Sequence, residues 1–419
     1  MKFAHLADTH LGYRQFGLIE REKDFYEVFE KVIDKIIEEK VDFVIHSGDL
    51  FETARPSPNA LLAFQKGLLK LKGAGIPMYA IAGNHDSVMR QGAIPPQVIF
   101  KKLGLKVISP INTDYMHGDI FIGGLPYYPS SQNKTLKSKL AELSKKAANH
   151  EKSILVLHQG IDKYLGYQYE LELGDIPDNF TYYAFGHIHK YINESFGNGR
   201  LVYPGSGEIW KTDEVDDYKR NGKGFVVVDF DGPKPIVKRV KIDVPREFIN
   251  RSLDYENLES GIAGIKETIK DFDKQPILNL TIRDVESDTS AVYDVINEDL
   301  GDLSLMIRPK FNVKDDEVID EEEIKKNGLG AKGILVEQLK KYNDDNVTQL
   351  AIDLYDYLSK DKLEESQELI EQFYNDFYNS TKDEVELQAE EETEVETPQE
   401  KSEDVQVTFN EVLKWFLQN

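Results

Sequence analysis

Residues 1–10 read MKFAHLADTH, a short apolar run that ends in an acid and an imidazole. The pattern returns as VDFVIHSGD at residues 41–49 and as IPMYAIAGNHD at residues 76–86. Each run has the length and apolar content of a buried strand. Between them, apolar residues recur at helical spacing over residues 21–39, and a serine–proline pair at residues 57–58 is typical of a helix start. This alternation of strands and helices predicts a parallel sheet with right-handed crossovers.

Later apolar runs extend this domain and indicate further strands. They lie at residues 119–128, 153–160, 182–189, 200–206 and 224–230. Because few helices separate the last of them, we expect an α/β fold over residues 1–230, in which two packed β-sheets are flanked by helices. Residues 231–311 repeat a strand–helix–strand–helix–strand pattern, which predicts a small α/β capping domain.

The C-terminal part of the chain has a different composition. Residues 312–332 are charged and contain glycine, which predicts a linker, and residues 333–379 show the apolar periodicity of helices. Residues 380–406 are acidic and have almost no large apolar side chains, so we expect this segment to be disordered. In residues 407–419, VTFNEVLKWFLQN, a capping box precedes apolar residues on one helical face, which predicts a short amphipathic helix.

Composition limits the chemistry and the location. The chain has 419 residues and no cysteine, which excludes disulfides, thiolate zinc sites and cysteine nucleophiles. It has no apolar run long enough to cross a bilayer and no secretory signal pattern, so we expect a cytoplasmic protein. The net charge of −24 is uneven, because residues 1–230 hold 28 Lys and Arg against 29 Asp and Glu. A nucleic-acid substrate is therefore compatible with the nearly neutral first domain.

The predicted strands of the first domain share a chemical feature, because several end in residues that bind metals. These residues are Asp8, His10, Asp49, Asn84, His85, His158, His187 and His189. Ligands of an α/β sheet gather beyond the carboxyl ends of its strands, so we expect these side chains to meet. If the chain stays extended, His187 and His189 point to the same face. Carboxylates, an amide and imidazoles without thiolates favour Mn²⁺, Fe²⁺ or Zn²⁺, and so many ligands indicate a pair of ions that clamps a phosphoryl group.

The sequence motifs around these residues indicate a protein family more specifically than the placement of the residues at strand ends does. The strings LADTHLGYRQ, HSGDLFETARPSP, AIAGNHD, LHQG and FGHIH resemble those of the calcineurin-like metallophosphoesterases. They are similar in particular to the DNA-repair branch that contains the archaeal meiotic recombination eleven nucleases and bacterial SbcD. The resemblance spans residues 1–380 and leaves out the final tail. It implies a Mn²⁺-dependent DNA phosphodiesterase, with exonuclease and endonuclease activity, that processes double-strand break ends.

Carried over position by position, the resemblance implies a role for each motif residue. One ion would be held by Asp8, His10 and His189, the other by Asn84, His158 and His187, and both by Asp49. His85 has no metal in this scheme and would face the scissile phosphate as the catalytic residue. Tyr13, Arg14 and Arg55 follow the motif strands and would grip the phosphate backbone, with solvated loop residues as the alternative. Some relatives have a histidine where this chain has Glu52.

The resemblance also implies partners besides DNA. The helices at residues 333–379 would bind the coiled-coil base of an SMC-like ABC ATPase of the Rad-fifty type, with packing against the second domain as the alternative. A homodimer is expected, and Leu62, Ile99 and Leu103 would form either its apolar stripe or ordinary core packing.

Two other functions are compatible with the motifs. One is a calcineurin-like phosphodiesterase that acts on nucleotides or phosphoproteins, and the other is a non-enzymatic scaffold that keeps the fold. The extra domain and the helices at residues 333–379 disfavour the first, because a small substrate does not need them. The complete ligand set disfavours the second, because a scaffold need not retain both Asn84 and His85.

Overall fold

The computed structural model describes most of the first 313 residues and short parts of the remainder. The described residues are 1–87, 94–166, 168–232, 234–285, 289–313, 339, 345–358, 366, 369–370 and 372–373. The chain divides into two compact units, Met1–Lys314 and Asp315–Asn419. The three β-sheets of the structure lie in the first unit.

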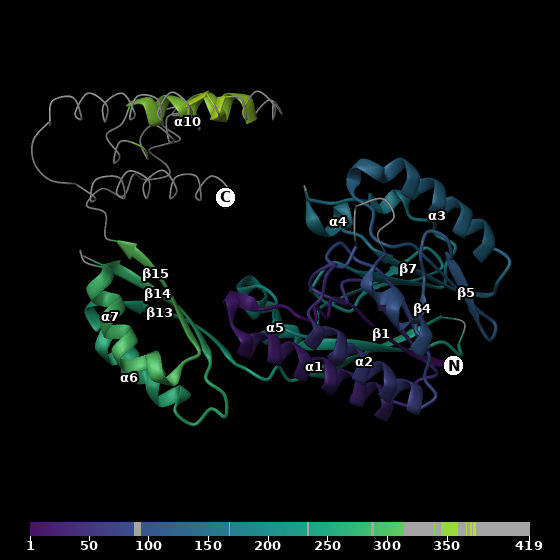
Figure 1. Ribbon diagram of the computed structural model, residues 1–419, viewed down its shortest axis with the longest axis horizontal. Coiled ribbons are helices and arrows are strands. Elements are labelled where there is room, and N and C mark those ends of the chain that lie inside the picture. Colours follow the sequence, from purple (N-terminus) through teal and green to yellow (C-terminus); the bar gives the residue numbers. More distant parts are fainter. Residues whose placement is uncertain are drawn as a thin grey trace, which may run out of the picture. The chain divides into compact units, whose positions relative to one another are not determined.

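The first sheet has six strands and is parallel at its centre. Its order is β12 (Ile236–Ile242), β11 (Lys223–Asp229), β1 (Lys2–Leu6), β2 (Phe43–Ser47), β3 (Met78–Ile81) and β4 (Lys106–Val107). The strands from β1 to β4 are parallel, whereas β11 pairs antiparallel with β1 and β12. Helices α1 (Ile19–Glu38) and α2 (Pro58–Gly73) connect β1 to β2 and β2 to β3, which confirms the predicted alternation (Figure 1). Because β12 belongs to this sheet, the sheet continues beyond residue 230, where the sequence places the end of the first domain.

The second sheet also has six strands, and its centre is again parallel. Its order is β5 (Asp114–His117), β6 (Ile120–Gly124), β7 (Lys152–His158), β8 (Tyr182–Gly186), β10 (Gly199–Tyr203) and β9 (Ile192–Phe196). The edge strands β5 and β9 pair antiparallel with their neighbours. The further helices of this part are α3 (Asn133–Ala147), α4 (Asp162–Leu165) and α5 (Val215–Asn221). The short 3-10 helices are η1 (Gln15–Gly17), η2 (Pro96–Leu103), η3 (Ser130–Gln132), η4 (Leu173–Asp175) and η5 (Thr212–Glu214).

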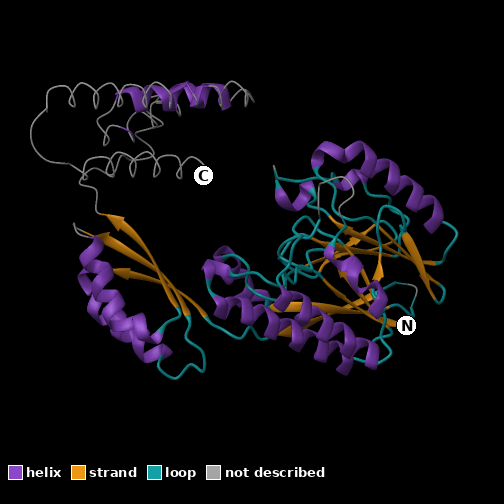
Figure 2. Ribbon diagram, in the orientation of Figure 1, coloured by secondary structure: helices purple, strands orange, loops and turns teal. Residues whose placement is uncertain are grey.

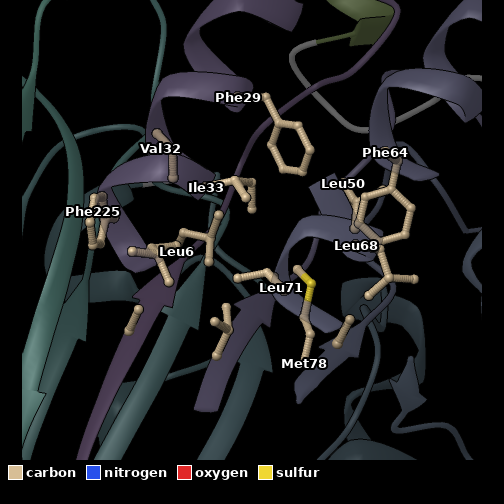
Figure 3. Close-up of a cluster of buried hydrophobic side chains, with 14 of the residues drawn as sticks. Leu6, Phe29, Val32, Ile33, Leu50, Phe64, Leu68, Leu71, Met78 and Phe225 are labelled. Carbon is tan, nitrogen blue, oxygen red and sulfur yellow. The ribbon is translucent and has the colours of Figure 1, made fainter. Parts of the chain in front are cut away.

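Alternation along the strands sorts the apolar side chains into layers. In β1, Phe3 belongs to the core shared by the two sheets, whereas Ala4 and Leu6 belong to the core between the first sheet and its helices. Figure 3 shows that second core, with Ile33 of α1 near Leu6 of β1 and Leu68 of α2 beside Phe64. Helix α3 covers the second sheet in the same way, and Figure 2 shows the helices outside the strands. The expected pair of packed sheets flanked by helices is therefore confirmed.

The start of α2 follows the predicted local chemistry. The side chain of Ser57 accepts a hydrogen bond from the backbone N–H of Ala60 at 3.2 Å, and Pro58 is the first helical residue. A serine at the N-cap satisfies a backbone donor that the helix leaves free, and proline loses nothing there because it has no N–H. This cap fixes where the chain leaves the loop after β2, which carries Asp49.

A third, smaller sheet forms a separate layer with its own core. Its strands, all parallel, are β13 (Phe248–Asp254), β14 (Ile277–Val285) and β15 (Met306–Val313). Helices α6 (Leu258–Ile269) and α7 (Thr289–Leu300), with the 3-10 helices η6 (Tyr255–Asn257) and η7 (Gly301–Leu303), complete it. Ile262 of α6 and Ile296 of α7 pack on Leu280 of β14. The predicted order of strands and helices is confirmed, and we call residues 248–313 the capping domain.

In the second unit, the described residues include helix α10 (Asp345–Leu358), which lies inside the segment 333–379 predicted to be helical. The residues after β15 up to 332, the acidic segment 380–406 and the terminal segment 407–419 lie outside the described residues. The linker, the disorder and the short helix predicted there stay predictions. Among the described residues, no helix has both the length and the apolar content that a membrane span requires.

Candidate metal centre

The residues predicted to bind metals come together in the structure. They follow β1, β2, β3 and β8 or end β7, and they are Asp8, His10, Asp49, Asn84, His85, His158, His187 and His189. Four of them, Asp8, His10, Asp49 and His158, are at most 2% exposed. Because charged and imidazole groups are costly to bury without partners, their concentration at one place needs a specific chemical reason.

One group of donors consists of Asp8, His10 and His189. Their donor atoms lie within 4.8 Å of one another, and Nε2 of His10 is 3.1 Å from Nε2 of His189. Each imidazole uses its other nitrogen to donate to a carboxylate, His10 to Glu52 at 2.7 Å and His189 to Glu214 at 2.8 Å. In the neutral tautomers that these bonds select, two nitrogen lone pairs face each other. A shared cation is the ligand that such an arrangement suits.

A second group surrounds Asn84. Its Oδ1 lies 2.9 Å from Nδ1 of His187 and 3.1 Å from Nε2 of His158. Nδ1 of His158 donates to the backbone carbonyl of Ser47 at 2.8 Å, so its neutral tautomer presents the Nε2 lone pair to the site. Burial and the neighbouring His158 lower the pKa of His187 to about 3, which keeps this imidazole neutral. The group therefore offers one amide oxygen and two imidazole nitrogens.

Asp49 lies between the two groups. Its Oδ2 is 3.1 Å from Nε2 of His158 and 3.8 Å from Nε2 of His10. Burial opposes the charge of Asp49, but His158 outweighs it and holds the pKa of this carboxyl below its usual range. Burial likewise lowers the pKa of His158, whereas Asp49 raises it to about 9. The carboxylate is therefore ionised and placed to serve both groups at once.

The backbone that carries these side chains is strained. Among the described residues, seven non-glycine residues have a positive φ, and four of them are Asp8, His10, Asp49 and His187. Such conformations cost energy and gather at functional sites. The φ of His187 is 91°, so the chain does not stay extended after β8, and the condition under which both imidazoles would point to the same face is not met. Instead, His187 contacts Asn84 and His189 contacts His10.

Two glycines allow the ligand loops to approach each other. A Cβ on Gly83 would collide with the carboxylate of Asp49, and a Cβ on Gly48 would collide with the imidazole of His158. Gly48 also has a φ of 97°, which side chains rarely adopt. These two motif glycines are therefore required by the close packing of the residues that follow β2 and β3.

His85 lies beside both groups but has different contacts. Its Nδ1 is 3.1 Å from the backbone carbonyl of Glu52 and 3.5 Å from the Glu52 carboxylate, and a quarter of its side chain is exposed. Burial lowers the pKa of His85, but the hydrogen bond to Glu52 and the charge of Asp49 outweigh it and raise the pKa to about 9. His85 is thus protonated at neutral pH and accessible. Its donor atom also lies close enough to those of His10 and Glu52 to form a third possible metal-binding group.

Residues that the sequence did not assign to the site orient its imidazoles. Glu52 and Glu214 accept from His10 and His189, and Lys223, which is 1% exposed, forms an ion pair with Glu214. Carboxylates that fix the outer nitrogen of a ligating histidine set its tautomer and raise its basicity. Nothing in the sequence could single out Glu214, because it is one acid among several in the stretch KTDEVDD.

Glu170 and Trp210 are also near the imidazoles. Oε2 of Glu170 lies 3.8 Å from Nε2 of His187. The indole of Trp210 stacks on His10 with ring centroids 5.2 Å apart, and its Nε1 donates to the Glu52 carboxylate at 3.1 Å. Trp210 is one of only two tryptophans in the chain, and this rarity was the one signal that could have drawn attention to it.

The three predicted substrate-binding residues have unequal positions. Tyr13 lies against Trp210, with ring centroids 5.4 Å apart, and is therefore next to the metal centre. Arg14 forms an ion pair with Glu22, although half of its side chain is exposed. Arg55 is exposed in the loop before α2. Their contacts with a phosphate backbone stay predictions.

Comparison with known proteins agrees with this geometry. Residues 1–191 match the family model of the calcineurin-like phosphoesterases. The DNA double-strand break repair protein Mre11 of Methanococcus maripaludis is 39% identical over 338 residues, which cover 77% of this chain and 88% of that protein. The Mre11 of Methanocaldococcus jannaschii is 36% identical over 380 residues, which cover 90% and 99%. The Mre11 of Saccharolobus solfataricus is 34% identical over 316 residues, which cover 74% and 81%. The chain therefore belongs to the Mre11 family of DNA double-strand break repair nucleases, a branch of the calcineurin-like metallophosphoesterases.

Proposed function

We propose that the chain uses two Mn²⁺ ions to hydrolyse phosphodiester bonds at DNA double-strand break ends, as an exonuclease and endonuclease in complex with an SMC-like ABC ATPase of the Rad-fifty type. The proposed site of this activity is the chromosome, in the cytoplasm. The observation that carries the proposal is the pair of donor groups that meet at Asp49. Carboxylate, amide and imidazole donors without a thiolate suit Mn²⁺.

The donor set fits two ions. Asp8, His10 and His189 would hold one, Asn84, His158 and His187 the other, and Asp49 both. The fit rests on His10, His158 and His189, each of which donates its Nδ1–H to a fixed oxygen and leaves Nε2 for a cation. When bound, two such cations supply Lewis-acid stabilisation of the phosphoryl oxygens and acidify water.

His85 is the proton donor in this proposal. Its Nδ1 donates to the backbone carbonyl of Glu52, so Nε2 is the nitrogen that offers a proton to the substrate. Without bound cations, Glu52 and Asp49 favour the charged imidazole, and beside a substrate His85 would stabilise negative charge on the phosphate or protonate the leaving oxygen. Glu52 has the supporting task of holding the ring and its charge in place.

The test compares two substrates in the presence of Mn²⁺, linear duplex DNA and a generic phosphodiester dye. The proposal is supported if the wild-type protein cleaves the DNA and the His85→Ala variant does not. Cleavage of the dye alone would favour a phosphodiesterase for nucleotides or phosphoproteins. Cleavage of neither, with and without the ATPase, would favour a scaffold.

The ATPase would bind through residues 333–379, the segment that contains α10. Deletion of residues 333–419 should abolish binding of the ATPase and preserve Mn²⁺-dependent cleavage by the remaining domains. Co-purification measures the binding, and a truncated protein that still co-purifies contradicts this part of the proposal. Packing of the segment against the capping domain is the alternative that such a result would favour.

A homodimer would use the outer face of α2 and the region of η2. Leu62 and Ile99 are 61% and 59% exposed there. Leu103, the third residue of the predicted stripe, is partly buried against the core between the first sheet and its helices. Combined Leu62→Glu and Ile99→Glu changes should therefore yield a monomer in sedimentation experiments. The matched control is Ile111→Glu, because Ile111 is 99% exposed in the loop before β5 and should leave the dimer intact.

A further inference from the structure

A buried cluster of charges joins α1 to the capping domain. Its centre is Asp24 on α1, whose carboxylate accepts from Arg21 and Arg246 at 2.8 Å each and from Lys274 at 3.1 Å. Arg246 lies in the segment that enters β13, and Lys274 lies within the capping domain, just before β14. Arg21, Asp24 and Arg246 are 0%, 1% and 6% exposed. Buried charges are tolerated only when their partners stay in place, so this cluster resists relative movement of the elements that it joins.

Arg21 extends the cluster toward the loop after β10. Its Nη2 donates to Oε1 of Glu208 at 3.1 Å and to the carbonyl of Ile209 at 3.2 Å. Its Nε donates to Gln15 at 2.8 Å, and Gln15 donates in turn to the carbonyl of Trp210 at 2.8 Å. One guanidinium therefore binds the carboxylate on α1 and also fixes the backbone of residues 208–210.

Apolar packing follows the same path. Ile209 is fully buried in a cluster with Phe248 of β13 and Ile277 of β14. The ring of Phe248 also lies 5.0 Å from the guanidinium of Arg21. The residue directly before Trp210 thus rests on the capping domain, and a displaced domain would leave both Ile209 and the charges without their neighbours.

The path ends at the metal centre. Trp210 donates from Nε1 to the carboxylate of Glu52, and its ring centroid lies 5.2 Å from that of His10 and 5.4 Å from that of His85. Glu52 contacts both of these imidazoles. A continuous set of contacts therefore leads from Arg246, beside the capping domain, to His85.

We propose that Arg21 and Asp24 are positioning residues that couple the placement of the capping domain to Trp210 and, through Glu52, to the imidazole of His85. A ligand or partner that shifts the capping domain then changes the position of the proton donor. The energetic reason is that the buried charges of Asp24 and Glu208 keep their partners only if the domain and the loop move together. The activity readout of this inference rests on the proposed nuclease function, and the fluorescence readout does not.

The experiment uses the full-length protein and removes Arg246, the buried positive charge that Asp24 meets from outside α1. Arg246→Met leaves Asp24 its bonds to Arg21 and Lys274 but removes the buried guanidinium that joins Asp24 to the segment before β13 and to the carbonyl of Gln275. The matched control is Lys266→Met, because Lys266 pairs with Asp299 on the exposed surface of the capping domain. With Mn²⁺ and linear DNA, Arg246→Met should lower kcat about tenfold at nearly unchanged KM, since small displacements of catalytic groups cost rate rather than binding. The control should stay at the wild-type kcat.

Two further measurements separate coupling from general damage. With Trp415→Phe as the background, Trp210 is the sole tryptophan, and its emission should shift in Arg246→Met but not in Lys266→Met. With Trp210→Phe as the background, Arg246→Met should have no further effect on kcat, because the path is already interrupted. An unchanged emission, or an undiminished loss of kcat in the Trp210→Phe background, overturns the proposal.

If Arg246→Met does not fold, Arg246→Lys replaces it, since it keeps the charge but not the planar group that also contacts the carbonyl of Gln275. The same measurements of kcat and of the Trp210 emission then apply, and the same outcomes support or overturn the proposal. A wild-type protein that does not cleave DNA contradicts the proposed function, and the Trp210 emission still decides the coupling.

Discussion

Glu52 holds His85 at two points, with its backbone carbonyl 3.1 Å and its carboxylate 3.5 Å from Nδ1 of the imidazole. The same carboxylate accepts from His10 at 2.7 Å and from Trp210 at 3.1 Å. Some proteins that the motifs resemble have a histidine at position 52, whereas this chain has Glu52, which binds both His10 of the metal centre and His85 beside it. Glu52 therefore connects the geometry of the metal centre to the charge of His85.

Glu52→Gln should lower the pKa of His85 from about 9 toward its ordinary value in the metal-free protein, because the neutral amide keeps the shape but not the charge. Since the pKa of His85 is higher in the folded than in the unfolded protein, its stabilising effect is complete below the unfolded pKa of about 6.5 and is lost as the pH rises through about 9. The free energy of unfolding should therefore fall more at pH 6 than at pH 10. NMR titration and denaturant unfolding measure the two quantities, with Glu30→Gln on the surface as the control. An unchanged His85 titration contradicts the assignment.

His85→Ala should abolish DNA cleavage and leave the bound Mn²⁺ nearly intact. The reason is that the two donor groups are complete without His85, which contacts Glu52 instead. Metal analysis after equilibrium dialysis measures the Mn²⁺ content, and a cleavage assay measures the activity. Loss of a full equivalent of Mn²⁺ would show that His85 is a ligand, as the alternative group with His10 and Glu52 would require.

Asp49→Ala should remove both ions, in contrast to His85→Ala. A single carboxylate lies between the two donor groups, 3.1 Å from His158 and 3.8 Å from His10. Its loss takes away the negative charge that both groups share and leaves His158 without its partner. Calorimetric titration with Mn²⁺ is the measurement. One ion still bound at full affinity would mean that Asp49 does not bridge.

Glu214→Gln should weaken the binding of one Mn²⁺ ion about 10- to 100-fold, because Glu214 orients His189. The affinity for the other ion should be unchanged, since the contacts of the group around Asn84 do not involve Glu214. It also leaves Lys223 as a buried charge, which should cost about 3 kcal/mol of stability.

Adding Lys223→Met to Glu214→Gln separates the two effects. The double variant should regain most of the stability, because no buried charge is left unpaired, but should keep the weakened metal binding. Thermal unfolding and Mn²⁺ titration distinguish these readouts. Restored metal affinity in the double variant would show that Glu214 acts on the fold rather than on His189.

The sequence by itself determined the sheets and most of the metal centre. Apolar runs of strand length, separated by helical patterns, allow few arrangements, and the carboxyl ends of parallel strands lie on one edge of a sheet whatever their exact lengths. Asp8, Asp49 and His158 follow or end such strands, so their convergence could be predicted without any knowledge of the contacts. The resemblance to the family then implied which of these residues would hold which ion.

Only the tertiary structure decided which residues support those ligands. Glu214 and Lys223 became visible only because the chain brings them to His189, and Arg21 meets Asp24 on α1 and Phe248 of the capping domain at the same point. The backbone turn at His187, which sends the paired imidazoles to different groups, is also set by its surroundings. The physical reason is that strand and helix patterns record local burial, whereas an ion pair or an imidazole tautomer depends on partners from distant parts of the chain. A buried charge is stable only where those partners meet, and no local pattern in the sequence records that meeting.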